Sequence, residues 1–196
     1  MLAVSGLLAP LALLDGCVSG PRGPLPPAVP VVPVAQWGGT PTPAPAQAQR
    51  ITRLTVHHQG EIWRAGDDVP AYLRRLQAWS RQTKGWVDIP YHYVVSPEGG
   101  VYAARPAAIA GDTNTEYNPT GHLLVMLLGN FEEQLPTQAQ WDSTVAVVAQ
   151  LLAQYGLDAT AIGSHRDFSA QTVCPGANLY ARLDELRAAV AARLRM

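Results

Sequence analysis

The sequence has few cysteines and no concentration of positive charge. It holds 2 cysteines, and its 14 lysines and arginines nearly balance its 15 aspartates and glutamates. Because no lysine- or arginine-rich stripe is present, the charge pattern predicts no nucleic-acid partner. The two cysteines can pair in principle, but Cys17 lies in an N-terminal segment with its own explanation. That leaves Cys174 as a free thiolate or a metal ligand.

The sequence also lacks an internal repeat, and its length suits one folded domain with some additional chain. Its 196 residues, of which 47% are hydrophobic, are enough to bury a substantial core. The 17 prolines are more than a compact domain usually needs, and most of them precede residue 50. We therefore expect a single folded domain at residues 50–196, preceded by two segments of different character.

The first segment, residues 1–17, has the features of an export signal. Met1–Leu14 is almost entirely apolar, carries no charge and is too short to cross a bilayer comfortably. Leu14-Asp-Gly-Cys17 then resembles a bacterial lipobox, whose cysteine is lipidated. Asp15 and the lack of a basic residue near Met1 depart from that pattern, so a plain secretory signal or an uncleaved apolar tail are alternatives. We expect an exported protein of the cell envelope, either a membrane-anchored lipoprotein or periplasmic or secreted, with membrane contact only through a lipid on Cys17.

The second segment, residues 18–49, is rich in proline and alanine. Dense proline disfavours helix and central strand and favours an extended chain. The composition predicts a linker that acts as a stalk between the export signal and the folded domain.

Hydrophobic periodicity in residues 50–196 alternates between strand and helix patterns. Apolar or β-branched runs predict strands at 51–57, 91–96, 101–104, 123–128 and 161–165. Apolar stripes with capping residues predict helices at 67–84, 137–156 and 179–194. Because strands and helices are interspersed, the predicted class is α/β (mixed α+β), a single domain with a central mixed β-sheet flanked by helices.

One stretch near the C-terminus, Gly163–Gly176, combines side chains that suit zinc. It contains His165 and Cys174, and two ligands cannot complete a zinc site. The pair His57-His58, at the end of an apolar run, is the candidate source of a third. Three protein ligands and one open position are typical of catalytic zinc in a surface cleft. Successive strand residues point to opposite faces, so only one of the two histidines readily faces the metal, and the residues alone leave the choice open.

Five short segments occur in a fixed order in the globular part of the chain. They are 56–58, 85–95, 100–106, 127–131 and 164–176. Together they resemble the zinc-dependent N-acetylmuramoyl-L-alanine amidases, the group that includes amidase-type phage lysozymes and peptidoglycan recognition proteins. The resemblance runs from about residue 51 to residue 186, which is nearly the whole globular part.

This resemblance implies a Zn²⁺ cofactor held by His57, His165 and Cys174. Two neutral imidazoles and one thiolate leave the metal site with a net charge of about +1, which suits activation of water and polarisation of an amide carbonyl. Tyr91 matches a tyrosine beside the zinc that orients water or stabilises the oxyanion; a half-buried sheet tyrosine is the alternative. Thr172 occupies a position that is often lysine in the family, and its hydroxyl adds a hydrogen-bond donor but no charge.

The sequence indicates roles outside the metal site for three further side chains. We expect His92 to support the core, His122 to be exposed or at the cleft rim, and Arg105 to contact an acidic group of the substrate.

The resemblance further implies an enzyme that hydrolyses the amide bond between N-acetylmuramic acid and the L-alanine of the peptidoglycan stem peptide. The expected partner is peptidoglycan or a muropeptide, and we expect a monomer. The alternative is a peptidoglycan-binding module without catalytic activity.

Overall fold

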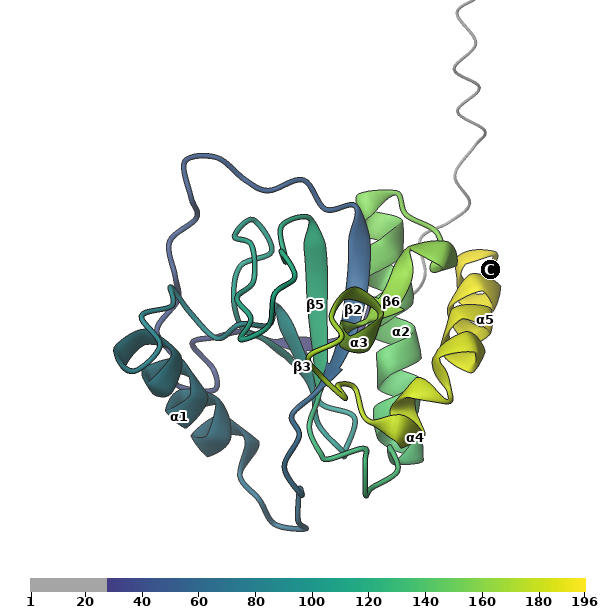
Figure 1. Ribbon diagram of the computed structural model, residues 1–196, viewed down its shortest axis with the longest axis horizontal. Coiled ribbons are helices and arrows are strands. Elements are labelled where there is room, and N and C mark those ends of the chain that lie inside the picture. Colours follow the sequence, from purple (N-terminus) through teal and green to yellow (C-terminus); the bar gives the residue numbers. More distant parts are fainter. Residues whose placement is uncertain (1–27) are drawn as a thin grey trace, which may run out of the picture.

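The computed structural model describes residues 28–196 and shows one β-sheet with helices on both faces (Figure 1). The predicted export signal at 1–17, with Cys17, lies outside the described residues, as does the first part of the predicted linker. Among the described residues, no helix is both long enough and apolar enough to cross a membrane.

The sheet is mixed and has the strand order β1-β4-β3-β5-β2-β6. Its strands are β1 (Val31–Val32), β2 (Arg53–His58), β3 (Tyr93–Val95), β4 (Val101–Ala103), β5 (His122–Leu127) and β6 (Ile162–Ser164). Only the hairpin pair β3 and β4 is antiparallel; every other neighbouring pair is parallel. The carboxyl ends of β2, β3, β5 and β6 therefore meet at one edge of the sheet, which is where loop residues can gather into a site.

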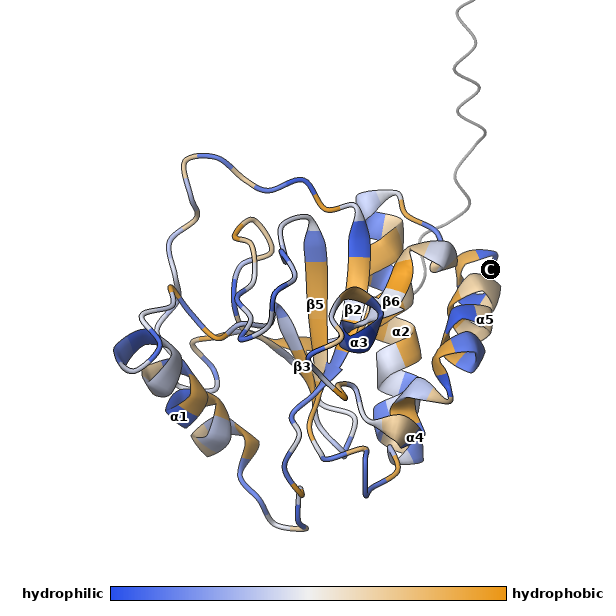
Figure 2. Ribbon diagram, in the orientation of Figure 1, coloured by the Kyte–Doolittle hydropathy of each residue, from blue (hydrophilic) through white to orange (hydrophobic). Residues whose placement is uncertain are grey.

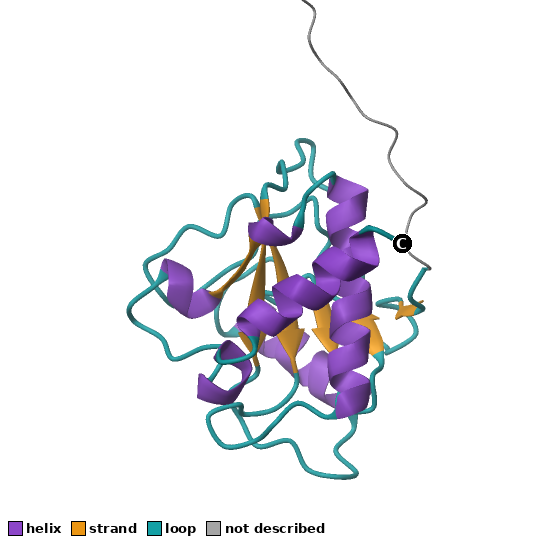
Figure 3. Ribbon diagram, turned by 90° about the vertical axis from the view of Figure 1, so that its right-hand side faces the viewer, coloured by secondary structure: helices purple, strands orange, loops and turns teal. Residues whose placement is uncertain are grey.

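The helices divide between the two faces of this sheet. They are α1 (Val69–Gln82), α2 (Gln138–Tyr155), α3 (His165–Phe168), α4 (Ala177–Tyr180) and α5 (Leu183–Leu194), with a 3₁₀ turn at Ala159–Ala161. Figure 1 shows α1 on one side of the strands and α2 with α5 on the other, and the view in Figure 3 shows α2 and α5 in front of the sheet. The mixed α/β architecture predicted from periodicity is confirmed.

Both faces of the central strands are apolar, because both are covered by helices. Leu54 and Val56 of β2 are fully buried in the cluster beneath α2 and α5. Met126 of β5 faces the opposite way and packs in a second cluster with Leu73 of α1. Most of β5 is coloured as hydrophobic in Figure 2, which agrees with burial on both faces. The alternation of side chains along β2 and β5 thus decides which residues face α1.

Helix ends follow the local signals of the sequence, with one exception. The Asp68 carboxylate accepts a hydrogen bond from the Ala71 N–H and caps α1, and the left-handed Gly156 ends α2. The predicted helix at 179–194 is wrong as a single element. The chain forms α4 and α5 with a turn at 181–182 between them, so Leu179 and Leu183 both lie in the core.

Residues 28–49 differ from the predicted stalk, because they pack on the folded domain. Val31 of β1 pairs in parallel with Val101 of β4. Trp37 is 1% exposed, and its indole N–H donates to the Ala103 carbonyl at 2.7 Å. Short apolar pieces between the prolines supply this contact, and a two-residue edge strand tolerates neighbouring proline. We call residues 28–49 the N-terminal arm.

Replacement of Trp37 by alanine tests whether the arm belongs to the core. We expect Trp37→Ala to lower the free energy of unfolding by about 3–5 kcal/mol, because a buried indole is lost and a cavity remains. Trp79, which is 41% exposed, is the matched control, and Trp79→Ala should cost about 1 kcal/mol or less. Urea denaturation measures both. A loss for Trp37→Ala as small as the one expected for Trp79→Ala would show that the arm adds nothing to the core.

His92 is a buried histidine whose two ring nitrogens are both used. Its Nδ1 accepts from the Leu124 N–H at 2.8 Å, and its Nε2 lies 2.9 Å from the Ile109 carbonyl oxygen. This pattern fits the neutral ring with the proton on Nε2. Burial lowers the pKa of His92 from 6.5 to about 4. The expectation that His92 supports the core is confirmed.

This burial makes stability fall in mild acid. Since the pKa of His92 is lower in the folded chain than in the unfolded chain, its contribution is complete above pH 6.5 and is lost as the pH falls toward 4. Between pH 7 and pH 5 we expect this one ring to cost about 2 kcal/mol of unfolding free energy. Urea denaturation of wild type and His92→Asn at both pH values measures it. A variant as pH-dependent as wild type would contradict this assignment.

Candidate metal centre

Two neighbouring parallel strands place His57 beside His165. Val56 of β2 pairs with Ser164 of β6, so the residue that follows each of them lies at the same level of the sheet. The two imidazole rings have centroids 4.8 Å apart. Strand register, which the core enforces, therefore brings together two histidines that are distant in the sequence.

Cys174 reaches the two histidines from the loop that follows α3. Its Sγ lies 3.5 Å from His57 Nδ1 and accepts from the His58 backbone N–H at 3.3 Å. Gly176 has φ +89°, and a Cβ at this position would lie 2.4 Å from the Phe131 backbone. The glycine thus permits the close approach of the loop that carries the thiol.

His57, His165 and Cys174 offer one ligand atom each within 4.8 Å of one another. The distance of 3.5 Å from Cys174 Sγ to His57 Nδ1 is close to the roughly 3.6 Å between nitrogen and sulfur ligands of tetrahedral zinc. His57 Nε2 is buried and has no hydrogen-bond partner among the described residues. His57 Nδ1, the ring atom that faces Cys174 Sγ, is the one placed to bind a metal, and a set of two imidazoles and one thiol fits zinc.

Burial also sets the charge of these three groups. It lowers the pKa of His57 well below 6.5 and that of His165 to about 4, so both rings are neutral at pH 7 and keep a lone pair. Burial raises the pKa of the Cys174 thiol to about 12. Without a cation nearby the thiol keeps its proton, and a dication would favour the thiolate.

The structure decides between the two adjacent histidines. His57 faces α1 and the other two candidate ligands, whereas His58 turns to the opposite face of β2. His58 Nδ1 accepts from the Phe131 N–H at 3.2 Å. His58 therefore supports the loop after β5 and lines the cleft, while His57 belongs to the group of candidate ligands.

Tyr91 and Thr172 both lie beside this group. Tyr91 precedes β3, and its ring centroid is 5.0 Å from that of His57. Burial raises the pKa of its phenol well above 10, so the hydroxyl remains a hydrogen-bond donor. The Thr172 hydroxyl accepts from the Cys174 N–H at 3.1 Å, which orders the loop just before the cysteine. The alternative that Tyr91 is an ordinary sheet residue is not supported, because it lies outside the strands and lines the cleft.

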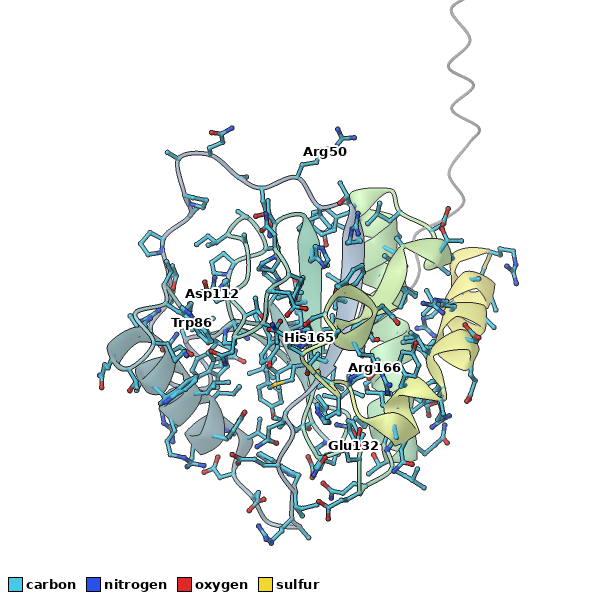
Figure 4. All side chains as sticks on the ribbon, viewed as in Figure 1. Arg50, Trp86, Asp112, Glu132, His165 and Arg166 are labelled. Carbon is cyan, nitrogen blue, oxygen red and sulfur yellow. The ribbon has the colours of Figure 1, made fainter. Side chains whose placement is uncertain are left out.

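The candidate ligands line a cleft of about 610 Å³ between the carboxyl edge of the sheet and α1. Tyr72 and Trp79 of α1, with Trp86, form one wall, and the loop with Asp112 contributes to another. Figure 4 shows His165 near the middle of the molecule, with Trp86 and Asp112 on the α1 side of it. A lining that combines aromatic rings with charged and polar groups suits a ligand that has both apolar and polar parts.

Two sequence expectations near the cleft are wrong. Arg105 is 3% exposed, donates to the backbone carbonyls of Asp88 and Ile89, and pairs with Asp112. It braces the loops around Tyr91 and is not free to contact a substrate. His122 is buried at the start of β5, where its Nδ1 lies 2.8 Å from the Thr55 hydroxyl. The burial of Arg105 and of His122 cannot be predicted from neighbouring residues, because it depends on segments that are distant in the sequence.

One residue at the site has no signal in the sequence. Thr115, in the loop before β5, places its hydroxyl oxygen 2.8 Å from His165 Nε2. Threonine in a loop is common, and no motif distinguishes this one. Only the approach of the loop to α3 reveals the contact.

This chain is similar in sequence and in fold to proteins of one family. The model of the N-acetylmuramoyl-L-alanine amidase family matches residues 47–177. Peptidoglycan-recognition protein SD of Drosophila simulans is 30% identical over 160 residues, which cover 77% of this chain and 82% of the relative. N-acetylmuramoyl-L-alanine amidase of Sus scrofa is 30% identical over 157 residues, which cover 76% of this chain and 26% of the relative. The crystal structure of Drosophila peptidoglycan recognition protein SD matches with a TM-score of 0.70 at 29% identity, covering 81% of this chain and 95% of that one.

The adjacent histidines allow a matched test of the ligand group. We expect His57→Asn to lose bound zinc and His58→Asn to keep it, because only His57 faces His165 and Cys174. Asparagine at position 58 retains an oxygen that can accept from the Phe131 N–H. Metal content after dialysis, measured by atomic emission, gives the zinc per chain, and circular dichroism checks the fold. Retention of zinc by His57→Asn would remove His57 from the ligand group.

Proposed function

This chain belongs to the N-acetylmuramoyl-L-alanine amidase family, and we propose that it is a zinc-dependent amidase. The proposed reaction is hydrolysis of the amide bond between N-acetylmuramic acid and the L-alanine of the peptidoglycan stem peptide. The observation that carries the proposal is the convergence of His57, His165 and Cys174 in the cleft, with Tyr91 beside them.

His57, His165 and Cys174 would hold the zinc ion. When bound, zinc supplies a Lewis acid that polarises an amide carbonyl and makes water more acidic. His57, His165 and Cys174 all line the cleft, so a substrate and water could reach a metal held there.

The residues of the chain have separate roles in this reaction. Tyr91 donates its phenol proton in a hydrogen bond to the carbonyl oxygen as that oxygen gains negative charge. The raised pKa of Tyr91 keeps this proton in place at neutral pH. Thr172 holds the loop that presents Cys174 and lines the cleft. Its neutral hydroxyl adds no positive charge, so Tyr91 is the principal protein donor near the carbonyl.

The cleft supports peptidoglycan or a muropeptide as the ligand. Its wall combines the aromatic rings of Trp79 and Trp86 with the charged groups of Glu61 and Arg75. A sugar linked to a short peptide has the apolar faces and charged ends that such a wall accepts. The names of the relatives refer to peptidoglycan recognition and to amidase activity, which agrees with this ligand class.

We further propose that the protein acts in the cell envelope. This rests on the sequence of residues 1–17, because the substrate lies outside the cytoplasmic membrane and an export signal would bring the enzyme to it.

The second candidate is a peptidoglycan-binding module without catalysis. It is favoured by relatives that are named recognition proteins. The complete group of two histidines and one cysteine favours the enzyme, because binding of a wall fragment by itself requires no metal ligands.

An assay of amide cleavage tests the enzyme directly. Residues 28–196, which include the N-terminal arm, are incubated with a muramoyl-peptide, and the freed L-alanine amino terminus is measured. We expect release that stops with a chelator and returns with added zinc. Cys174→Ser should reduce release at least about 100-fold, because a neutral hydroxyl replaces a thiolate ligand. Binding of the muropeptide without release would favour the binding module, and release that persists in the chelator would exclude the zinc mechanism.

A further inference from the structure

We propose that Thr115 positions His165 for metal binding, through a hydrogen bond that directs the Nδ1 lone pair of the ring toward the other ligands. The proposal rests on the zinc site of the proposed function. Thr115 lies in the loop between β4 and β5, and in this proposal it orients a zinc ligand. Thr113 supports it by holding Thr115 in place.

The contacts form a short chain of hydroxyl groups. Thr115 Oγ1 lies 2.8 Å from His165 Nε2, and Thr113 Oγ1 lies 2.8 Å from Thr115 Oγ1. Thr113 Oγ1 also accepts from the Thr115 backbone N–H at 3.1 Å. Thr115 is therefore held by two hydrogen bonds to Thr113, one through its hydroxyl and one through its backbone N–H.

This chain fits one arrangement of the protons well. A neutral imidazole has one N–H and one lone pair, and a metal binds the lone pair. If His165 Nε2–H donates to Thr115 Oγ1, the Thr115 hydroxyl can donate to Thr113 Oγ1. The lone pair of His165 then resides on Nδ1, which is free to serve as the ligand atom. The alternative proton arrangement leaves Nδ1 protonated and unable to bind a metal.

The two ligand histidines differ in this respect. His57 Nδ1 contacts Cys174, and its Nε2 has no hydrogen-bond partner among the described residues. His165 alone of the two has a side chain from outside the ligand group bonded to a ring nitrogen. Its ring also packs against Tyr117, with centroids 5.0 Å apart. Packing thus restrains the plane of the His165 ring, and Thr115 decides which edge faces the ligands.

A residue that hydrogen-bonds the second ring nitrogen of a ligand histidine affects how tightly that histidine binds metal. Such a residue holds the tautomer and orientation of the ring, so removing it typically costs about 10–100-fold in metal affinity. Thr113 and Thr115 also line the cleft, so the loop that forms a cleft wall is the one that orients a ligand.

The test uses the full chain and two substitutions at one position. Thr115→Val removes the hydroxyl at nearly constant shape, and Thr115→Ser retains it. Zinc dissociation constants are measured by competition with a chromophoric chelator. We expect Thr115→Val to weaken zinc binding about 10–100-fold, and Thr115→Ser to stay within about 3-fold of wild type. Thr120→Val, at an exposed position of the same loop, is the control and should bind zinc as wild type does.

A second measurement examines the ring without metal. In the zinc-free protein with ¹⁵N-labelled histidine, long-range ¹H–¹⁵N spectra identify which nitrogen of His165 carries the proton. We expect the Nε2–H tautomer in wild type and Thr115→Ser, and a mixture in Thr115→Val. A wild-type Nδ1–H tautomer, or equal zinc affinity of Thr115→Val and wild type, would overturn the proposal. Wild type that binds no zinc would refute the proposed function instead, and the tautomer measurement would still decide the role of Thr115.

Discussion

The parallel pairing of β2 with β6 is the constraint on which the candidate site depends. Leu54 pairs with Ile162 and Val56 with Ser164, and the apolar members of these pairs are buried under α2 and α5. A shift of one residue would send every side chain of β2 to the other face. The apolar core therefore holds the register, and the register holds His57 beside His165. Stability of the core and geometry of the ligands are consequences of one pairing.

A second set of contacts connects the N-terminal arm to the side of the sheet that carries the cleft. Asp88 is fully buried, accepts from the side chains of Thr42 and Gln77, and also accepts from the Ile89 N–H. It thus ties the arm and α1 to the segment that leads to Tyr91. Arg105 braces the same segment from the other side. The arm that composition assigns to a stalk is part of the support for the proposed oxyanion donor.

Local signals explain which parts of the fold could be predicted. The strands and long helices follow from periodicity and caps, because these depend on neighbours within a few residues. The turn between α4 and α5 was not predicted, since the stripe from Leu183 onward continues the pattern of Leu179. The packing of the N-terminal arm on the domain cannot be predicted from the sequence, because its proline content is typical of an extended linker. The burial of Trp37 depends on a pocket formed by distant elements. For the same reason, the sequence does not indicate the contact of Thr115 with His165, and it wrongly predicts a substrate contact for Arg105.

The sequence alone determined the candidate ligands, which are the imidazoles of the His57-His58 pair and of His165 and the one thiol of the globular part. It also carried the motifs of the amidase family, whose model matches residues 47–177. It also determined the alternation of helix and strand, because backbone preference and side-chain period are local properties. The residues alone left the choice between His57 and His58 open, although the resemblance implied His57. The tertiary structure shows that His57 faces Cys174 and that Thr115 contacts His165. These outcomes depend on strand register and on loop approach, which are set by packing between residues far apart in the chain.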